Sequence, residues 1–96
     1  MIALITGATS GIGKHTAIEF AKNGYDLIVT GRRQERLFEL NAYLTKEYGI
    51  KVIDLCFDVR DEQQVSNAFN SLPVAFRQID VLVNNAGLAA GLSGIQ

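Results

Sequence analysis

The segment that decides the fold of this 96-residue chain is Ile2-Ala3-Leu4-Ile5-Thr6-Gly7-Ala8-Thr9-Ser10-Gly11-Ile12-Gly13. An apolar run leads directly into a glycine-rich turn, and a stretch with helical periodicity follows the turn. This order predicts a strand that ends in the turn and a helix that begins there. The unpaired N–H groups and the positive dipole end at such a helix start attract anions. We therefore predict a phosphate-binding loop over residues 6–13.

The three glycines of this loop have different predicted roles. Gly7 permits the tight turn, Gly11 lets a phosphate approach the backbone, and Gly13 lets the helix pack closely against the sheet. Their spacing, Gly7-x3-Gly11-x-Gly13, differs from the common dinucleotide pattern G-x-G-x-x-G. An ordinary strand-to-helix turn is the alternative interpretation. Three glycines within seven residues would be unfavourable in such a turn, because each one raises the conformational entropy lost on folding.

The composition indicates one globular domain spanning residues 1–96. The chain is 48% hydrophobic and 20% charged, and it contains one proline. A net charge of −1 provides no electrostatic footprint for nucleic acid or for an anionic membrane. The apolar runs are far shorter than the ~20 residues that span a bilayer, and no basic leader precedes the first strand. We expect a cytoplasmic protein without nucleic-acid or membrane partners.

The single cysteine and the single histidine carry no predicted chemistry. Cys56 has no second cysteine for a disulfide or a metal site, and we expect it to be a small buried residue of a strand. No carboxylate or second histidine accompanies His15. We predict neither a metal site nor a catalytic residue in the chain.

Strand-like and helix-like segments alternate along the chain. Four runs rich in Ile, Val and Leu, at residues 2–6, 26–30, 51–57 and 81–84, predict buried parallel strands. Three helices are predicted between them: from Ser10 or Gly11 to Asn23-Gly24, along residues 37–48 before Gly49, and from the Asp61/Gln64 capping pair to Pro73. The expected buried helix residues are Ile12, Ala17, Phe20, Ala21, Leu37, Leu40, Leu44, Tyr48, Val65, Ala68, Phe69 and Leu72.

This alternation predicts an α/β fold with a doubly wound parallel sheet, the βαβαβαβ portion of a Rossmann fold. Right-handed crossovers place helices on both faces of such a sheet. We predict the strand order 3-2-1-4. The crevice where this order reverses then lies between the first and fourth strands, with the glycine loop at its lip.

Two motifs at the predicted strand ends carry a family resemblance. They are Thr6-Gly7-x3-Gly11-x-Gly13 after the first strand and Asn84-Asn85-Ala86-Gly87 after the fourth, and with them the chain resembles the short-chain dehydrogenase/reductase family. Three further stretches look like the bacterial NADP-dependent 3-hydroxy acid dehydrogenases that act on serine and allo-threonine. They are residues 31–37, 58–60 and 79–89. The resemblance implies hydride transfer between NADP(H) and a small hydroxy or keto compound.

The end of the second strand favours NADP over NAD as the cofactor. NAD-preferring folds place an acidic residue there to bind the ribose 2′-OH, whereas this chain has Thr30-Gly31 followed by Arg32-Arg33. Two guanidiniums would bind the 2′-phosphate through charge-assisted hydrogen bonds. Asp26, the acid of that strand, lies at its opposite end. The alternative is that both arginines are simply the basic start of a surface helix.

The resemblance implies further cofactor contacts. Gly7, Ala8, Thr9, Ser10, Gly11 and Ile12 would hold the phosphates, Asp58 and Val59 would border the adenine, and Asn85 and Ala86 would lie against the adenosine ribose. Asn84 is expected to tie neighbouring strands together. Asp58 is also a common type of turn residue, and Asn-Ala-Gly is also ordinary loop composition.

The family's catalytic Tyr-x-x-x-Lys pair is absent from these residues. The three tyrosines, Tyr25, Tyr43 and Tyr48, are followed four positions later by Val29, Glu47 and Val52. We therefore expect an inactive N-terminal fragment of an enzyme that is a tetramer or dimer when complete. A non-catalytic nucleotide-binding module and a truncated relic are the alternatives.

Overall fold

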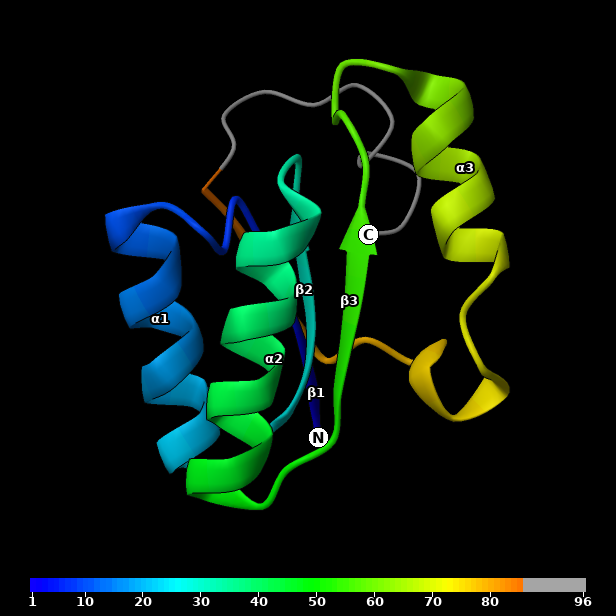
Figure 1. Cartoon of the computed structure of the whole chain (residues 1–96). Helices are drawn as coiled ribbons and strands as arrows, with labels where there is room; N and C mark the ends of the chain where they lie inside the picture. Colours follow the sequence, from blue (N-terminus) through cyan, green and yellow to red (C-terminus); the bar gives the residue numbers. More distant parts are fainter. Residues whose placement is uncertain (86–96) are drawn as a thin grey trace.

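The computed structural model of the chain describes residues 1–85 as a four-stranded parallel sheet with helices on both faces (Figure 1). The elements are, in order, β1 (Ile2–Thr6), α1 (Gly11–Lys22), β2 (Asp26–Gly31), α2 (Gln34–Tyr48), β3 (Val52–Cys56), α3 (Glu62–Asn70), a 3-10 turn (Val74–Phe76) and β4 (Val81–Asn84). The strand order β3-β2-β1-β4 confirms the prediction. The predicted second strand ended one residue too early, and the predicted third strand was one residue too long at each end.

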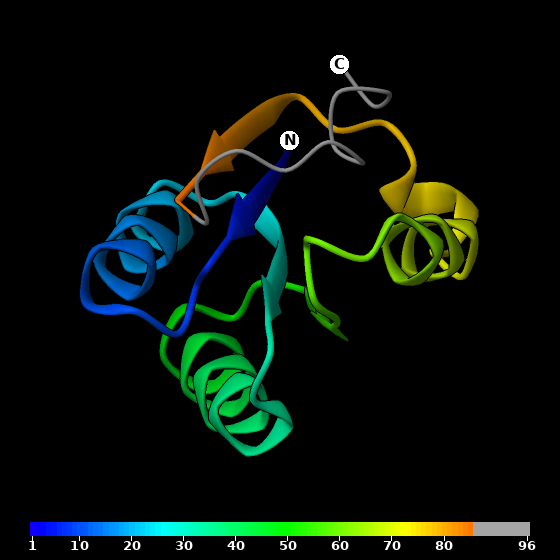
Figure 2. The same cartoon turned by 90° about the horizontal axis from the view of Figure 1, so that it is seen from above.

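The alternating side chains of β1 supply both cores. Ala3 and Ile5 point to the face covered by α1 and α2, whereas Leu4 points to the face covered by α3 and the 3-10 turn. In the view along the sheet, α1 and α2 lie on one side of the strands and α3 on the other (Figure 2). β1 and β2 are therefore buried on both faces, as their continuous apolar sequences predict.

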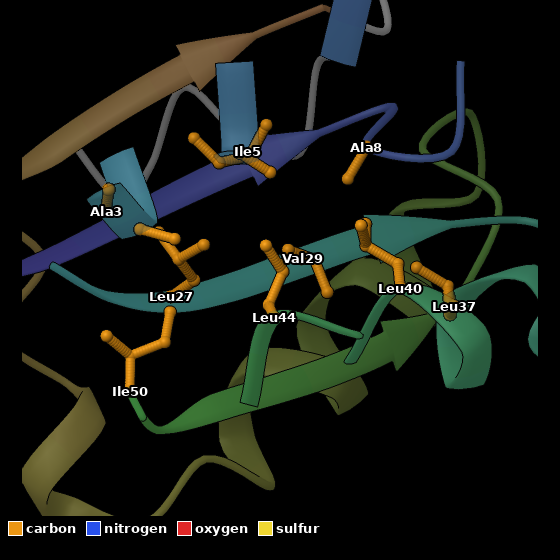
Figure 3. Packing of buried hydrophobic residues seen from close by; sticks show 11 residues of the cluster. Ala3, Ile5, Ala8, Leu27, Val29, Leu37, Leu40, Leu44 and Ile50 are labelled. Atoms are coloured by element: carbon orange, nitrogen blue, oxygen red, sulfur yellow. The ribbon is translucent and has the colours of Figure 1, made fainter. Parts of the chain in front are cut away.

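The larger core lies between the sheet and the first two helices (Figure 3). Helix α2 contributes Leu37, Leu40 and Leu44 at helical spacing, and their side chains meet Val29 of β2. Helix α1 buries only small residues: Gly13, Ala17 and Ala21. Because these residues are four positions apart and short, the axis of α1 can lie close to the strands.

The expected burial of Ile12 was wrong. Its side chain is 76% exposed, because Ile12 lies one position, about 100° of helix rotation, away from the stripe through Gly13, Ala17 and Ala21. Phe20, at the edge of the same stripe, is half-buried and packs edge-on against Tyr25. The sheet-facing surface of α1 is thus narrower than its apolar sequence indicated.

The opposite core confirms the predicted third helix. Asp61 accepts hydrogen bonds from the backbone N–H groups of Gln63 and Gln64, so it caps α3. Val65 packs against Phe57, and Leu72 packs against Leu4 after the helix has ended. None of the described helices is long and apolar enough to cross a membrane.

The two outer strands are only half-buried, and Cys56 is exposed rather than buried as expected. Helix α2 begins beside Asp54 of β3, where the Gln34 amide donates a hydrogen bond to the Asp54 carboxylate at 2.9 Å. Cys56 lies two residues further along β3 on the same face. The helix therefore does not extend over it.

Gly13 provides a stability test of the close approach between α1 and the loop after β1. A Cβ at Gly13 would lie 2.0 Å from the backbone oxygen of Gly7, so Gly13→Ala should lower the free energy of unfolding by about 1–3 kcal/mol or more. Gly11→Ala is the matched control, because a Cβ there meets no atom within 4 Å. Urea unfolding measures both variants, and equal stabilities would contradict this packing.

Candidate functional site

A cleft of about 530 Å³ lies at the carboxyl ends of the parallel strands. Its walls come from the loop after β1, the junction of β2 with α2, the loop after β3, and the end of β4. The lining residues are Gly7, Thr9, Ser10, Thr30, Gly31, Arg32, Arg33, Arg36, Phe57, Asp58, Val59, Arg60 and Asn85. Segments far apart in the sequence therefore meet at the position where parallel sheets bind ligands.

The loop after β1 is held by its own hydrogen bonds. Gly7 has a positive φ of 61°, which confirms its role in the tight turn. Its carbonyl oxygen accepts from the Ser10 N–H at 3.2 Å and from the Ser10 hydroxyl at 2.8 Å. Ser10 Oγ also accepts from the Gly13 N–H at 3.3 Å and so caps α1. The loop therefore has one well-defined shape at the cleft wall.

The predicted loop residues do not all reach the cleft. Gly7, Thr9 and Ser10 line it. Ala8 is fully buried in the core, and its N–H donates to the Thr30 carbonyl at 3.0 Å, which fixes the loop to the end of β2. Gly11 and Ile12 lie in the exposed first turn of α1 and do not line the cleft.

Three arginines with no acidic partner line one wall. Within residues 1–85 the ion pairs are Lys22 with Glu19 and Arg60 with Asp58, so Arg32, Arg33 and Arg36 are not neutralised there. Arg33 is also the N-cap residue of α2 and makes no side-chain cap hydrogen bond. The first N–H groups of a helix have no intrahelical acceptor. Positive charge and free donors thus coincide at this wall.

The start of α2 is anchored to β3 beside these arginines. Asp54 of β3 accepts a hydrogen bond from Gln34 Nε2 at 2.9 Å and one from Asn41 Nδ2 at 2.7 Å. Asn41 Nδ2 also donates to the Val52 carbonyl at 3.2 Å. One carboxylate therefore holds the first two turns of α2 against the edge strand. The backbone that carries the arginines is fixed, although their side chains are exposed.

Asp58, in the neighbouring loop after β3, forms a two-point ion pair with Arg60. Arg60 Nε lies 3.1 Å from Asp58 Oδ1 and Arg60 Nη2 lies 2.9 Å from Oδ2. The Arg60 backbone N–H also donates to Oδ1, at 2.9 Å. These hydrogen bonds to the guanidinium and the backbone, together with the positive charges of Arg60 and Arg32, lower the pKa of the Asp58 carboxyl to about 2.

Two buried polar atoms of cleft-lining residues have no hydrogen-bond partner in the part of the chain that the structure describes. They are Thr30 Oγ1 and Asn85 Nδ2. Buried polar groups are nearly always paired, and an unpaired one costs ~1–3 kcal/mol. A bound molecule with hydroxyl or phosphate oxygens could supply the missing partners. The cleft therefore suits a polar, anionic ligand.

Thr6 joins the ends of β1 and β4, which confirms that Asn84 ties its strand to the neighbouring one. Its hydroxyl donates to Asn84 Oδ1 at 2.9 Å, and the Asn85 N–H donates to Thr6 Oγ1 at 3.0 Å. Thr6 is fully buried. These bonds place Asn85 at the cleft. Ala86, the other residue expected near the ribose, lies outside the described residues.

The sequence analysis did not identify Arg36, Phe57 and Arg60 as lining residues. Arg36 stands four positions after Arg32 and three after Arg33, and this helical spacing was a usable signal, because such residues share one face. Phe57 and Arg60 flank the predicted pair Asp58 and Val59. Nothing in the sequence indicated that Arg60 would turn back onto Asp58.

Comparison with known proteins gives consistent matches. The family model described as short chain dehydrogenase matches residues 1–95. Serine 3-dehydrogenase of Rhizobium radiobacter is 52% identical over 88 residues, which are 92% of this chain and 34% of the relative. Sulfoacetaldehyde reductase 2 of Chromohalobacter salexigens is also 52% identical over 88 residues, with the same two coverages. The chain thus spans about a third of the length of these curated relatives.

A solved structure with the same arrangement is the L-sorbose reductase of Gluconobacter frateurii, complexed with NADPH and L-sorbose. The TM-score is 0.83 and the sequence identity 37%, over 91% of this chain and 33% of the reductase. The sheet and helices described above are therefore shared with an NADPH-bound enzyme structure.

The ion pair at Asp58 gives a titration test. Arg60→Ala should raise the pKa of Asp58 from about 2 toward the ordinary value of ~3.9. The lowered pKa means that the ion pair contributes fully above that ordinary value and is lost as the pH falls toward 2. NMR titration of the side-chain carboxyl carbon measures the shift. Lys46→Ala, which removes an exposed positive charge elsewhere, is the control and should leave it unchanged.

The Thr6 hydroxyl gives a stability test. Thr6→Val keeps the shape of the side chain but leaves the Asn85 N–H and Asn84 Oδ1 without this partner, so the free energy of unfolding should fall by about 1–3 kcal/mol. Thr6→Ser keeps the hydroxyl and should cost less. If urea unfolding gave the reverse order, packing of the methyl group would outweigh the hydrogen bonds.

Proposed function

Since the chain belongs to the short-chain dehydrogenase family, we propose that its cleft binds NADP(H) for a hydride-transfer enzyme. The arginines at the start of α2 bind the 2′-phosphate, and the loop after β1 faces the pyrophosphate. NADP(H) supplies the hydride chemistry at its nicotinamide ring. The residues of this chain bind the cofactor, orient it and select it.

One observation carries this proposal: three arginines without an ion-pair partner in residues 1–85 line the cleft where β2 ends, and the one carboxylate that lines the cleft, Asp58, follows β3 and is paired with Arg60. Asp26, the acid of β2, is at the far end of the strand, where its carboxylate accepts from the Lys51 N–H at 2.9 Å. It is about five residues of strand, some 16 Å, from the arginines. A ribose 2′-OH would find no acceptor carboxylate on β2, whereas a 2′-phosphate would find several donors.

The alternative of a merely basic helix start fits the structure less well. Cations at the start of a helix are disfavoured by its dipole, and α2 has Glu35 in its first turn but no side-chain cap. Placing Arg32, Arg33 and Arg36 together at one wall of the cleft does not stabilise a surface helix. A phosphate at that wall would accept from the guanidiniums and from the free backbone N–H groups together.

We assign the remaining cofactor contacts to residues of the other walls. Thr9, Ser10 and the Gly11–Ile12 turn, with Gly7 and Ala8 shaping the loop, are assigned to the pyrophosphate. Asp58 and Val59 are assigned to the adenine, and Asn85 and Ala86 to the adenosine ribose.

The proposed reaction is oxidation or reduction between a small hydroxy compound and its keto form. The names of the relatives include serine and sulfoacetaldehyde, and both are small and polar. Serine or allo-threonine is our first candidate for the substrate. We propose that the residues acting on the substrate lie outside these 96 residues, and that the complete enzyme is a homo-oligomer. A reading frame that encodes Tyr-x-x-x-Lys downstream would support the enzyme over a binding module or a relic.

Titration calorimetry with NADPH and NADH tests the cofactor assignment. The protein should bind NADPH more tightly than NADH. Arg32→Ala should weaken NADPH about tenfold or more and leave NADH nearly unchanged, because a hydrogen bond to a charged group contributes ~1.5–3 kcal/mol.

Lys46→Ala is the control for the loss of one positive charge. Equal weakening of both cofactors by Arg32→Ala would refute the 2′-phosphate assignment. If neither cofactor bound saturably, only the relic alternative would remain.

A further inference from the structure

The Asp58 carboxylate is held more firmly than an ordinary surface acid. Asp58 Oδ1 accepts two hydrogen bonds, from the N–H and the Nε of Arg60, and Oδ2 accepts one, from Arg60 Nη2. The Asp58 N–H donates to Gln64 Oε1 at 3.0 Å, and Gln64 Nε2 donates to the Asp61 carboxylate at 3.2 Å. The backbone of Asp58 is therefore tied to α3, and its side chain is paired with Arg60 in the loop before α3.

This arrangement leaves one acceptor position more open than the other. Each oxygen of an ionised carboxylate can accept about two hydrogen bonds. Oδ1 already has two donors, whereas Oδ2 has one. Asp58 and Arg60 both line the cleft. The cleft wall therefore presents a fixed, ionised acceptor with room for one further donor.

The restraint on the Asp58 carboxylate matters because Arg32, Arg33 and Arg36 line the same cleft. The positive charge of Arg32 is the smallest of the causes that lower the pKa of Asp58, and both residues line the cleft. A carboxylate free to rotate would be attracted toward that charge. The ion pair with Arg60 satisfies the carboxylate on its own wall.

We infer that Arg60 is a positioning residue, which holds the Asp58 carboxylate so that it selects a nucleotide base with an exocyclic amine, such as adenine. The inference rests on the proposed cofactor site. An amine at this position donates to Oδ2. A keto oxygen there, as in hypoxanthine, places two acceptors against each other. Arg60 acts through Asp58 and does not itself read the base.

The alternative is that Arg60 forms an ordinary surface salt bridge, and such pairs contribute little to stability. The two roles predict different results. A merely structural pair changes the affinities for all nucleotides by the same factor. A positioning pair changes the ratio of the affinities for two nucleotides that differ only in the base.

Binding calorimetry with NADPH and with its hypoxanthine analogue measures that ratio. The wild-type protein should prefer NADPH by about tenfold, the value expected for one charge-assisted hydrogen bond. Arg60→Ala should reduce the preference at least to about threefold, and Asp58→Ala should abolish it. Lys46→Ala is the matched control and should keep the wild-type ratio. Circular dichroism checks that each variant is folded.

The double variant Asp58→Ala/Arg60→Ala identifies how Arg60 acts. If Arg60 works through Asp58, its removal should not change the ratio further once Asp58 is absent, so the two effects are not additive. Additive effects, or an Arg60→Ala ratio equal to that of the wild type, would overturn the inference while leaving the cofactor site intact. A wild-type protein that binds NADPH without preferring it over the analogue would overturn it as well. Absence of NADPH binding would overturn both.

Discussion

The contact between Gly13 of α1 and the carbonyl oxygen of Gly7 is the constraint on which the rest of the site depends. A Cβ at Gly13 would lie 2.0 Å from that oxygen, so any side chain would push α1 away from the loop. The loop is in turn bonded to the end of β2 through Ala8 and Thr30. A displacement of α1 would therefore be transmitted to the wall that carries the arginines. The small residues of α1 preserve this geometry along the whole helix.

The fold, and not the overall number of charged residues, determines where the positive charges of the cleft lie. The chain is nearly neutral, yet one wall has three arginines without an ion-pair partner in residues 1–85, while Asp58 in the neighbouring loop is paired with its own arginine. Asp54, which could also have approached the arginines, instead binds two side-chain amides of α2. Positive potential is therefore concentrated at one end of the cleft. Overall composition does not reveal this arrangement.

Sequence patterns predicted the element order, the strand order and the family, because each depends on local signals: apolar runs, caps and the two glycine-containing motifs. They also predicted the tie between Asn84 and its neighbouring strand, and a close approach at Gly13, although its partner is the loop after β1 rather than the sheet. Features that depend on where one element ends relative to another were not predictable. Cys56 is exposed because α2 begins at the level of Asp54, and Ile12 is exposed because it lies beside the small-residue stripe of α1. The Arg60 contact depends on a side-chain rotation that no sequence pattern specifies.

The connection between β1 and β4 has a consequence for the order of folding. Most of the cleft is built from segments between residues 7 and 60, but β1 pairs with β4 across nearly eighty residues, with Ala3 opposite Val81. Closing so long a loop costs entropy before any contact repays it, and such pairings slow folding. During synthesis, one edge of β1 must therefore wait until β4 has been made. Until then, the molecule holds most of a binding cleft on an incomplete sheet.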